Sequence, residues 1–352
     1  MRRIKQSLGV LAAAALAVAG VSAGTASAAT PPIAKTMAAW QAGISQLRAP
    51  GTGCYSAAYP TLQWHAVKCV TAPKTPLAPV LPGSARHGGP ATAGHGGPAI
   101  VGDGTDYSAQ VSGLITKGIG TFTNVSSGIS EKGGGVTNSF SLQLNSQFFS
   151  GSPECSGSSD PADCQAWGQF VYTYGSSRTS QIFIQYWLIN YNARCPSGWF
   201  TYSEDCYTNS SSANVTTVTA AQLGSVHLTG TAASGGNDDV SLSVGSGTAT
   251  TVGGKDTKID LAAFWNTTEW GVYGDGGGSE AVFGANTSLE AQTALTASSG
   301  STAPTCVKEG FTGETNNLTL ASTPALGSEP SPTMASRQTN GTTGTASCAT
   351  AG

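Results

Sequence analysis

Alternating apolar and polar residues run through the chain after residue 100 and predict β-strands. The run Ser139–Phe149 is the clearest case, because apolar and polar residues take turns along it: Phe140, Ser141, Leu142, Gln143, Leu144 and Asn145. A period of two is the mark of a strand with one buried face. Similar short runs recur at Tyr107–Ile115, Val226–Gly230, Val240–Val244, Lys258–Leu261, Glu269–Tyr273, Ala281–Phe283, Ser288–Leu295 and Asn317–Ala321. We therefore predict an all-β main domain, a jelly-roll or concanavalin-like β-sandwich, over residues 101–352.

Two further alternating runs, Gln169–Tyr174 and Gln181–Tyr191, flank a Gly-Ser-Ser turn and predict a β-hairpin. Glutamines recur among the aromatic residues of this region: Gln165, Trp167, Gln169, Gln181, Gln185, Tyr186 and Trp187. A sheet face that mixes large rings with amides is typical of a binding surface rather than a solvated one.

The N-terminal part has a different pattern. Apolar residues spaced by three and four predict an amphipathic helix: Ile33, Met37, Trp40, Ile44 and Leu47. Residues 29–70 are too few to bury a core alone, so we expect this module to pack on the main domain. Residues 71–100 are rich in proline and glycine and predict an extended, solvated linker. The arrangement indicates a propeptide; the alternative is an accessory module that stays attached.

Residues 1–28 have the three parts of a signal peptide: a basic start, an apolar stretch from Leu8 to Val21, and Ala26-Ser27-Ala28 before the cleavage point. We expect a secreted protein that does not insert into a membrane. Without these residues the chain has 13 basic and 19 acidic side chains, a balance that disfavours nucleic acid as a partner. Charged residues make up only 10% of the sequence. We expect a monomer.

The eight cysteines are even in number, which in an exported chain predicts disulfides. They fall in neighbouring pairs that each bracket one loop, so we predict these four bonds: Cys54–Cys69, Cys155–Cys164, Cys195–Cys206 and Cys306–Cys348. A zinc site is the rival interpretation. The sequence has no Cys-x-x-Cys motif and its histidines are scattered, so we expect no metal.

Few catalytic groups are available in the main domain. His227 is its one histidine, no Gly-x-Ser-x-Gly accompanies it, and the glycine run Gly274–Ser279 lacks the lysine of a phosphate-binding loop. Carboxylates and amides remain. Glu269 and Glu280 flank the glycine run, and a carboxyl beside aromatic residues has a raised pKa that suits a general base and acid.

Several short motifs resemble the glutamic peptidases, which include the plant neprosins and the fungal eqolisins. The motifs are Gln165-Ala-Trp-Gly-Gln-Phe-Val171, Gln185-Tyr-Trp187, Cys206-Tyr207, Glu269-Trp270 and Glu309-Gly-Phe311. The neprosin catalytic glutamate falls on Gln165, where eqolisins have a glutamine. The second catalytic glutamate falls on Glu280, with Glu269 as the alternative because nine residues separate Glu280 from Trp270. The resemblance covers roughly residues 138–321.

The resemblance implies a sandwich with seven-stranded sheets, made as a zymogen, that hydrolyses polypeptide substrates in acid. Glu280 would activate water and protonate the leaving amine, and Gln165 would stabilise the oxyanion. A groove would be lined by Trp167, Gln169, Gln185, Trp187 and Trp270. No metal or organic cofactor would be needed.

Two other classes stay open. An aromatic and amide-rich sheet face also suits a non-catalytic module that binds polysaccharide or other cell-envelope material, since rings stack on sugars and amides bond to hydroxyls. A purely structural envelope protein would have no deep groove. The prediction of a propeptide favours the peptidase, because a binding module needs no inhibitory segment.

Overall fold

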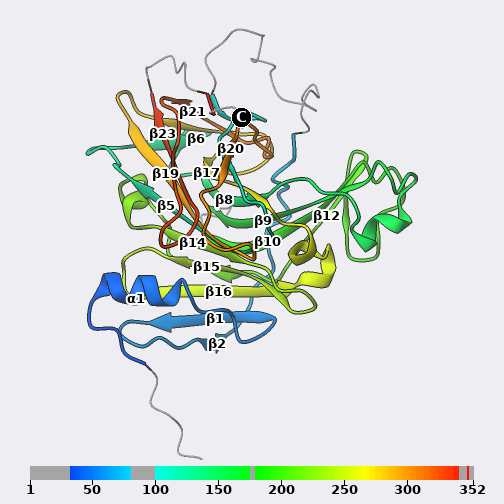
Figure 1. The fold of residues 1–352 in the computed structure, drawn as a ribbon, viewed down its shortest axis with the longest axis horizontal. Helices are drawn as coiled ribbons and strands as arrows, with labels where there is room; N and C mark the ends of the chain where they lie inside the picture. The colour runs from blue at the N-terminus through cyan, green and yellow to red at the C-terminus, as the bar shows by residue number, and fades with distance from the viewer. Residues whose placement is uncertain (1–31, 81–99, 175–178, 341–346, 349–352) are drawn as a thin grey trace, which may run out of the picture. The chain divides into compact units, whose positions relative to one another are not determined.

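The computed structural model describes residues 32–80, 100–174, 179–340 and 347–348, and this part of the chain is almost entirely β-structure. Its strands form two sheets (Figure 1). The larger has fourteen described strands, in the order β2 (His65–Val67), β1 (Gly53–Ala58), β16 (Thr248–Lys255), β15 (Asn237–Ser243), β14 (His227–Thr231), β5 (Ile115–Thr123), β19 (Ser288–Ala297), β23 (Thr333–Thr339), β21 (Thr315–Leu320), β18 (Glu280–Phe283), β6 (Glu131–Gly133) and β7 (Val136–Thr137), with β22 (Ala325–Gly327) on β23 and β3 (Ile100–Gly102) on β21.

The second sheet has nine described strands, in the order β11 (Phe200–Tyr202), β12 (Asp205–Asn209), β10 (Gln181–Ile189), β9 (Gln165–Thr173), β8 (Ser141–Ser146), β17 (Thr267–Tyr273), β4 (Ser108–Gln110) and β20 (Thr305–Val307), with β13 (Ala213–Asn214) on β10. Helical structure in the described residues is short: α1 (Met37–Ile44) and the 3-10 turns η1 (Pro153–Gly157), η2 (Ala220–Ser225), η3 (Asp256–Lys258) and η4 (Leu261–Ala263). The all-β class predicted from the alternation is confirmed.

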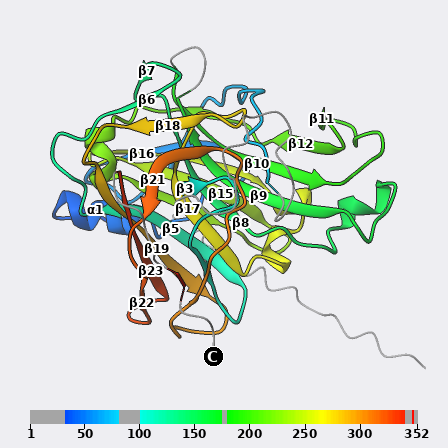
Figure 2. The ribbon, with the colours of Figure 1, turned by 90° about the horizontal axis from the view of Figure 1, so that it is seen from above.

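The main core lies between the two sheets. β10 lies against β15 and β16, which are labelled in both ribbon views (Figures 1 and 2), and β8 lies against β14 (Figure 1). Every second residue of β8, β9 and β10 points into this core, as the alternation predicts: Leu142, Leu144, Phe170, Tyr172, Ile182 and Ile184. At Gly230 of β14 a Cβ would lie 2.3 Å from the ring of Phe170, so glycine there lets the ring pack directly on the backbone.

The predicted N-terminal helix is shorter than its apolar stripe. Thr36 caps it by accepting a hydrogen bond of 3.1 Å from the N–H of Ala39, and the helix ends at Ile44. Ile33 lies before the helix in extended backbone, bridged to Thr61. The stripe nevertheless predicts burial correctly at Trp40, which packs in a second apolar cluster under the helix.

The N-terminal module is part of the larger sheet rather than a separate body. β1 pairs with β16 along its whole length, from the pair Gly53 and Gly253 to the pair Ala58 and Thr248. The apolar cluster beneath α1 includes Ala249 of β16 beside Trp40 and Trp64. Residues 53–67 thus extend the edge of the sheet, in agreement with the expectation that the module packs on the main domain.

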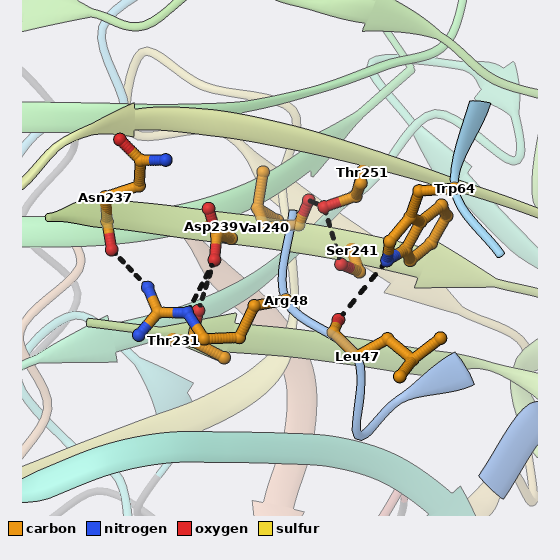
Figure 3. Close-up of polar contacts among 9 residues, drawn as sticks. All are labelled: Leu47, Arg48, Trp64, Thr231, Asn237, Asp239, Val240, Ser241 and Thr251. Carbon is orange, nitrogen blue, oxygen red and sulfur yellow. Dashed lines mark hydrogen bonds and ion pairs between the residues drawn. The ribbon is translucent and has the colours of Figure 1, made fainter. Parts of the chain in front are cut away.

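Arg48 forms an ion pair across this junction (Figure 3). Its Nε lies 3.1 Å from Oδ2 of Asp239 in β15, and its Nη2 donates to the backbone oxygen of Asn237. Asp239 also accepts a hydrogen bond of 2.9 Å from the hydroxyl of Thr231. Asp239 is buried, and burial raises its pKa while the Arg48 cation lowers it. Arg48 therefore partly compensates a carboxylate that water cannot reach.

All four predicted disulfides are present: Cys54–Cys69, Cys155–Cys164, Cys195–Cys206 and Cys306–Cys348. Four disulfides fit a protein that folds in an oxidising compartment. Within the described ranges, no helix has the length and apolarity that crossing a membrane requires.

Two local predictions were wrong. Lys258–Leu261 forms the 3-10 turns η3 and η4 rather than a strand, and the apolar side chains of Ile259 and Leu261 are buried beside Gly168 of β9. The described start of the linker, residues 72–80, is extended but only partly solvated, because Ala72, Leu77 and Ala78 are buried while Lys74 and Thr75 are exposed. The sequence His-Gly-Gly-Pro occurs twice in the predicted linker, at residues 87–90 and 95–98, and both copies lie outside the described residues, as does the turn at residues 175–178.

Candidate active site

The outer face of the nine-stranded sheet carries a row of polar side chains from five strands. Neighbouring strands pair Glu269 of β17 with Asn145 of β8, Asn145 with Gln169 of β9, Gln169 with Gln185 of β10, and Gln185 with Asn209 of β12. Cross-strand partners point to the same face with their Cβ atoms about 5 Å apart. Because alternate residues of these strands point into the core, this row forms on the opposite side of the sheet.

Hydrogen bonds join this row to Gln143 and Trp187, which lie on the same face, each two residues along its strand and on opposite sides of the row. The Oε1 atom of Gln143 accepts from Nε2 of Gln169 at 3.0 Å and from Nδ2 of Asn145 at 3.1 Å. The indole N–H of Trp187 donates to Gln169 Oε1 at 2.9 Å and to Gln185 Oε1 at 3.1 Å. All five side chains are buried, so their amides are held in fixed orientations by one another.

Glu314 enters this network from the loop before β21 of the other sheet. One carboxyl oxygen, Oε2, accepts from Nε2 of Gln143 at 3.3 Å and from the hydroxyl of Thr312. The other, Oε1, accepts from the backbone N–H of Gly278 at 3.2 Å. Glu314 is fully buried, and burial raises its pKa to about 7 although these hydrogen bonds lower it. A carboxyl that titrates near neutrality can accept and return a proton within one reaction cycle.

A pair of carboxyls, Glu269 and Asp106, lies at the β17 end of the row. Glu269 accepts from Asn145 Nδ2 at 2.8 Å and from the N–H of Phe311 at 3.3 Å, and Asp106 accepts from the N–H of Gly102 at 2.8 Å. Burial, followed by the charge of Glu269, holds the pKa of Asp106 well above its usual range. Burial also raises the pKa of Glu269. Two carboxyls in such a site behave as one unit that retains a proton to higher pH than either would in water.

The start of the predicted linker lies across this face as an extended peptide. Four successive carbonyl groups of the segment accept hydrogen bonds. Asn209 Nδ2 donates to Pro73 O at 2.8 Å, and the Tyr207 hydroxyl donates to Lys74 O at 2.7 Å. Gln185 Nε2 donates to the carbonyl of residue 75 at 3.4 Å, and a backbone N–H at position 277 donates to that of residue 76 at 3.0 Å. The segment is therefore recognised mainly through its backbone.

The C-terminal half of the segment meets the ionisable groups. The N–H of Leu77 donates to Gln185 Oε1 at 2.8 Å, and the N–H of Ala78 lies 3.3 Å from Glu314 Oε1. The N–H of Gly313 donates to the Ala78 carbonyl at 2.7 Å. The peptide bond between Leu77 and Ala78 is thus held against the carboxyl of Glu314, as a peptide substrate would be.

The glycine run between β17 and β18 covers the segment. Gly276, Gly277 and Gly278 all have positive φ, a conformation open to glycine without strain. This conformation turns the N–H of Gly277 toward the bound segment and the N–H of Gly278 toward Glu314. The run is a strap of backbone donors over residues 72–80, and the site that holds these residues is called the cleft below.

The two residues of the predicted dyad lie on different sheets. Gln165 is the first residue of β9, at the partly exposed end of the row face. It lines a pocket with Gln147 and Phe311, with a volume of about 250 Å³. Glu280 is the exposed first residue of β18 and pairs with Thr315 in the larger sheet. No contact joins Gln165 and Glu280 in the described structure.

The other predicted site residues divide between the two faces of the sheet. Trp167, Gln169, Gln185 and Trp187 lie on the row face, and Glu269, the alternative catalytic residue, lies there too. Trp270 points the other way, into the core, where its ring packs 4.9 Å from that of Phe122. Trp270 therefore does not line the groove.

Sequence reasoning missed three parts of this site. Gln143 and Asn145 belong to the predicted strand, but their polar face was taken for the solvated one. Glu314 follows Phe311 closely, and no motif marked it. Asp106 comes just before a short strand, also without a motif. The one available signal was the amide content of the predicted strand Ser139–Phe149, in which Gln143 and Asn145 alternate with apolar residues.

The described residues contain no group of three His, Cys, Asp or Glu side chains that could hold a metal ion. Comparisons with protein-family models, curated proteins and solved structures find no match to this chain. Its function has to be argued from the site itself.

Proposed function

We propose that this protein is a secreted peptidase, made as a zymogen, in which Glu314 is the general base and acid and Gln143 its amide partner. The observation that carries the proposal is the peptide bond between Leu77 and Ala78, whose nitrogen lies 3.3 Å from Glu314 Oε1. A buried carboxyl with a pKa of about 7 is placed against the bond that a peptidase must cleave.

The reaction follows from the groups around Glu314. In its charged form, Glu314 takes a proton from a water molecule, and the resulting hydroxide attacks the carbonyl carbon of the substrate. The Nε2 group of Gln143, which donates to Glu314 Oε2 at 3.3 Å, stabilises the negative oxygen that develops once Glu314 has taken the proton. Glu314 then gives its proton to the amide nitrogen, the carbon–nitrogen bond breaks, and a carboxylic acid and an amine leave.

In this proposal residues 72–80 regulate the peptidase activity. While they lie in the cleft, another polypeptide cannot reach Glu314. Cleavage within residues 71–106 followed by release of the segment opens the site. Glu314 has to be charged to take a proton from water, and burial raises its pKa to about 7, so activity should fall as the pH drops below this value. The activity in acid that the resemblance implies is therefore not part of this mechanism.

The test is incubation of the purified full-length protein from pH 3 to pH 8, with intact-mass spectrometry and a denatured protein substrate. We expect new chain ends within residues 71–106 and substrate cleavage that becomes faster as the pH rises from 3 to 7, because Glu314 has to be charged to accept a proton. A protein that stays intact and cleaves nothing across this range contradicts the proposal. Binding of a polysaccharide by such an inactive protein would instead support the carbohydrate-binding module.

A further inference from the structure

The side chain of Leu77 occupies an apolar site of its own in the cleft. Leu77 is 2% exposed and packs in a small cluster with Ala72, Val171 and Phe183. This cluster is separate from the main core between the sheets. Val171 and Phe183 are themselves fully buried, so the bound segment removes their side chains from water.

The strand register places this apolar site directly beside the polar row. Val171 of β9 and Phe183 of β10 are cross-strand partners, one step on from the pair Gln169 and Gln185. Gln185 holds the N–H of Leu77 at 2.8 Å. A peptide whose backbone is bound by Gln185 therefore presents the side chain at this position to Val171 and Phe183.

A second side chain of the segment meets an aromatic ring. The Lys74 ammonium lies 5.5 Å from the centre of the Phe200 ring, within the range of a cation–π contact. The carbonyl of Lys74 is held by Tyr207, whose ring lies 5.2 Å from that of Phe200. Phe200 is 38% exposed, so this contact is weaker than the burial of Leu77.

We infer that the cleft selects extended peptides with an aliphatic side chain of about the size of leucine immediately before the cleaved bond, and favours a basic side chain three residues earlier. This inference rests on the proposed peptidase activity. An acidic side chain at the leucine position would be buried without a partner among apolar groups, which is costly. A larger ring would have to displace Phe183.

The first experiment uses the self-processed full-length protein and synthetic peptides of the sequence of residues 72–80. We expect kcat/KM to fall about 10- to 100-fold when the leucine is replaced by alanine, and further when it is replaced by aspartate. Replacing the lysine by glutamate should lower kcat/KM by only a few fold. Equal rates for the leucine, alanine and aspartate peptides overturn the inference.

Two variants of the protein itself, rather than of the peptide, test the same site. Phe183→Ala enlarges the apolar site and should shift the preference from leucine toward phenylalanine, measured as a ratio of kcat/KM values within one preparation. Phe200→Ala lies at the surface and should remove only the preference for lysine. An unchanged leucine-to-phenylalanine ratio in a folded Phe183→Ala protein counts against the inference.

A second measurement requires no hydrolysis by the protein itself. Trypsin added at pH 8 cleaves after Lys74 only when the segment leaves the cleft. We expect the intact chain with Leu77→Asp to be cut there at least several fold faster than the natural chain, and Leu77→Ile to be cut at nearly the natural rate. If no peptide is hydrolysed but this difference is found, the proposed peptidase activity fails while the apolar binding site stands. If peptides are hydrolysed without a leucine preference, only the inference fails.

Discussion

The Oε1 atom of Glu314 lies 3.3 Å from the backbone nitrogen of Ala78, although the two residues are 236 positions apart in the chain. The two residues belong to different parts of the fold. Glu314 comes from the loop before β21 in the larger sheet, and Ala78 from the extended segment that crosses the smaller sheet. The contact joins a buried carboxyl to a peptide bond, and the first prediction depends on it.

Glu314→Gln should abolish self-cleavage and substrate hydrolysis, because glutamine keeps the shape of the side chain but cannot exchange a proton. Loss of a general acid and base costs about 100- to 10,000-fold in rate. The measurement is the rate of chain cleavage at pH 7, followed by mass spectrometry. Glu290→Gln, on β19 of the larger sheet, is the matched control.

The same assay separates the two possible glutamates. Glu280→Gln removes the residue that the resemblance to glutamic peptidases points to, and the structure places that residue at an exposed strand start. We expect Glu280→Gln to cleave at the natural rate. Loss of activity in Glu280→Gln together with full activity in Glu314→Gln would return the catalytic role to Glu280.

Gln185→Ala should loosen the segment in the cleft. The substitution removes the acceptor for the Leu77 N–H and the donor to the carbonyl of Thr75. We expect amide hydrogen exchange at Leu77 and Ala78 to become at least several fold faster, since each lost hydrogen bond stabilises the docked state by about 1 kcal/mol. Gln181→Ala, on the same strand but outside the row, is the control. Unchanged exchange at both amides would mean that Gln185 does not hold the segment.

The free energy of unfolding should rise as the pH falls from 8 to 5. Burial raises the pKa of Glu131 from 4.5 to about 8, and the Asp275 charge adds to this effect. The folded chain therefore binds a proton in this window that the unfolded chain does not. This contribution is complete below pH 4.5 and is lost as the pH rises through 8. Glu314, with a folded pKa of about 7, acts in the same direction.

The measurement is Tm by differential scanning calorimetry at pH 5 and pH 8. Glu131→Gln keeps the shape of the side chain without a proton to lose, so its Tm should depend less on pH than that of the natural chain. The backbone of Ser139 donates a hydrogen bond to Glu131 that lowers this pKa, and the Oε1 atom of glutamine can still accept it. A natural chain that is more stable at pH 8 than at pH 5 would contradict this prediction.

Arg48→Met should destabilise the junction between the N-terminal module and β15. Methionine retains much of the apolar stem but leaves Asp239 buried without its cation. Because Arg48 is partly exposed, we expect the free energy of unfolding to fall by about 1–3 kcal/mol, which is less than the cost of breaking a fully buried ion pair. Thermal unfolding at pH 7 measures it. Adding Asp239→Asn should recover part of the loss, and a double variant as unstable as Arg48→Met alone would argue against the charge as the cause.

Local patterns predicted much of the fold. Alternation in Ser139–Phe149 and around residues 165–191 anticipated β8, β9 and β10 and the side chains that face the core. The pairing of neighbouring cysteines was also correct, because short loops keep the partners close in space. Lys258–Leu261 failed because a short apolar run fits a buried turn as well as a strand, and the choice depends on packing beside Gly168.

The candidate site was predicted only in part. Gln169, Gln185 and Glu269 were singled out from their neighbours in the sequence, and the strand register brings them into one row. Trp270 was assigned to the groove, yet it is the residue next to Glu269 and so points to the opposite face. Gln143 and Glu314 were missed because their partners are distant in sequence and no local motif marks them.

The sequence by itself determined the class of structure, the disulfides and the faces of the main strands, because these depend on period, spacing and local chemistry. Tertiary structure decided which polar side chains meet. Strand order and register align Glu269, Asn145, Gln169 and Gln185 across four strands, and a crossing loop adds Glu314. The structure also placed residues 72–80 in the cleft. Pairing between distant strands is set by the packing of the whole core, which no short stretch of sequence encodes.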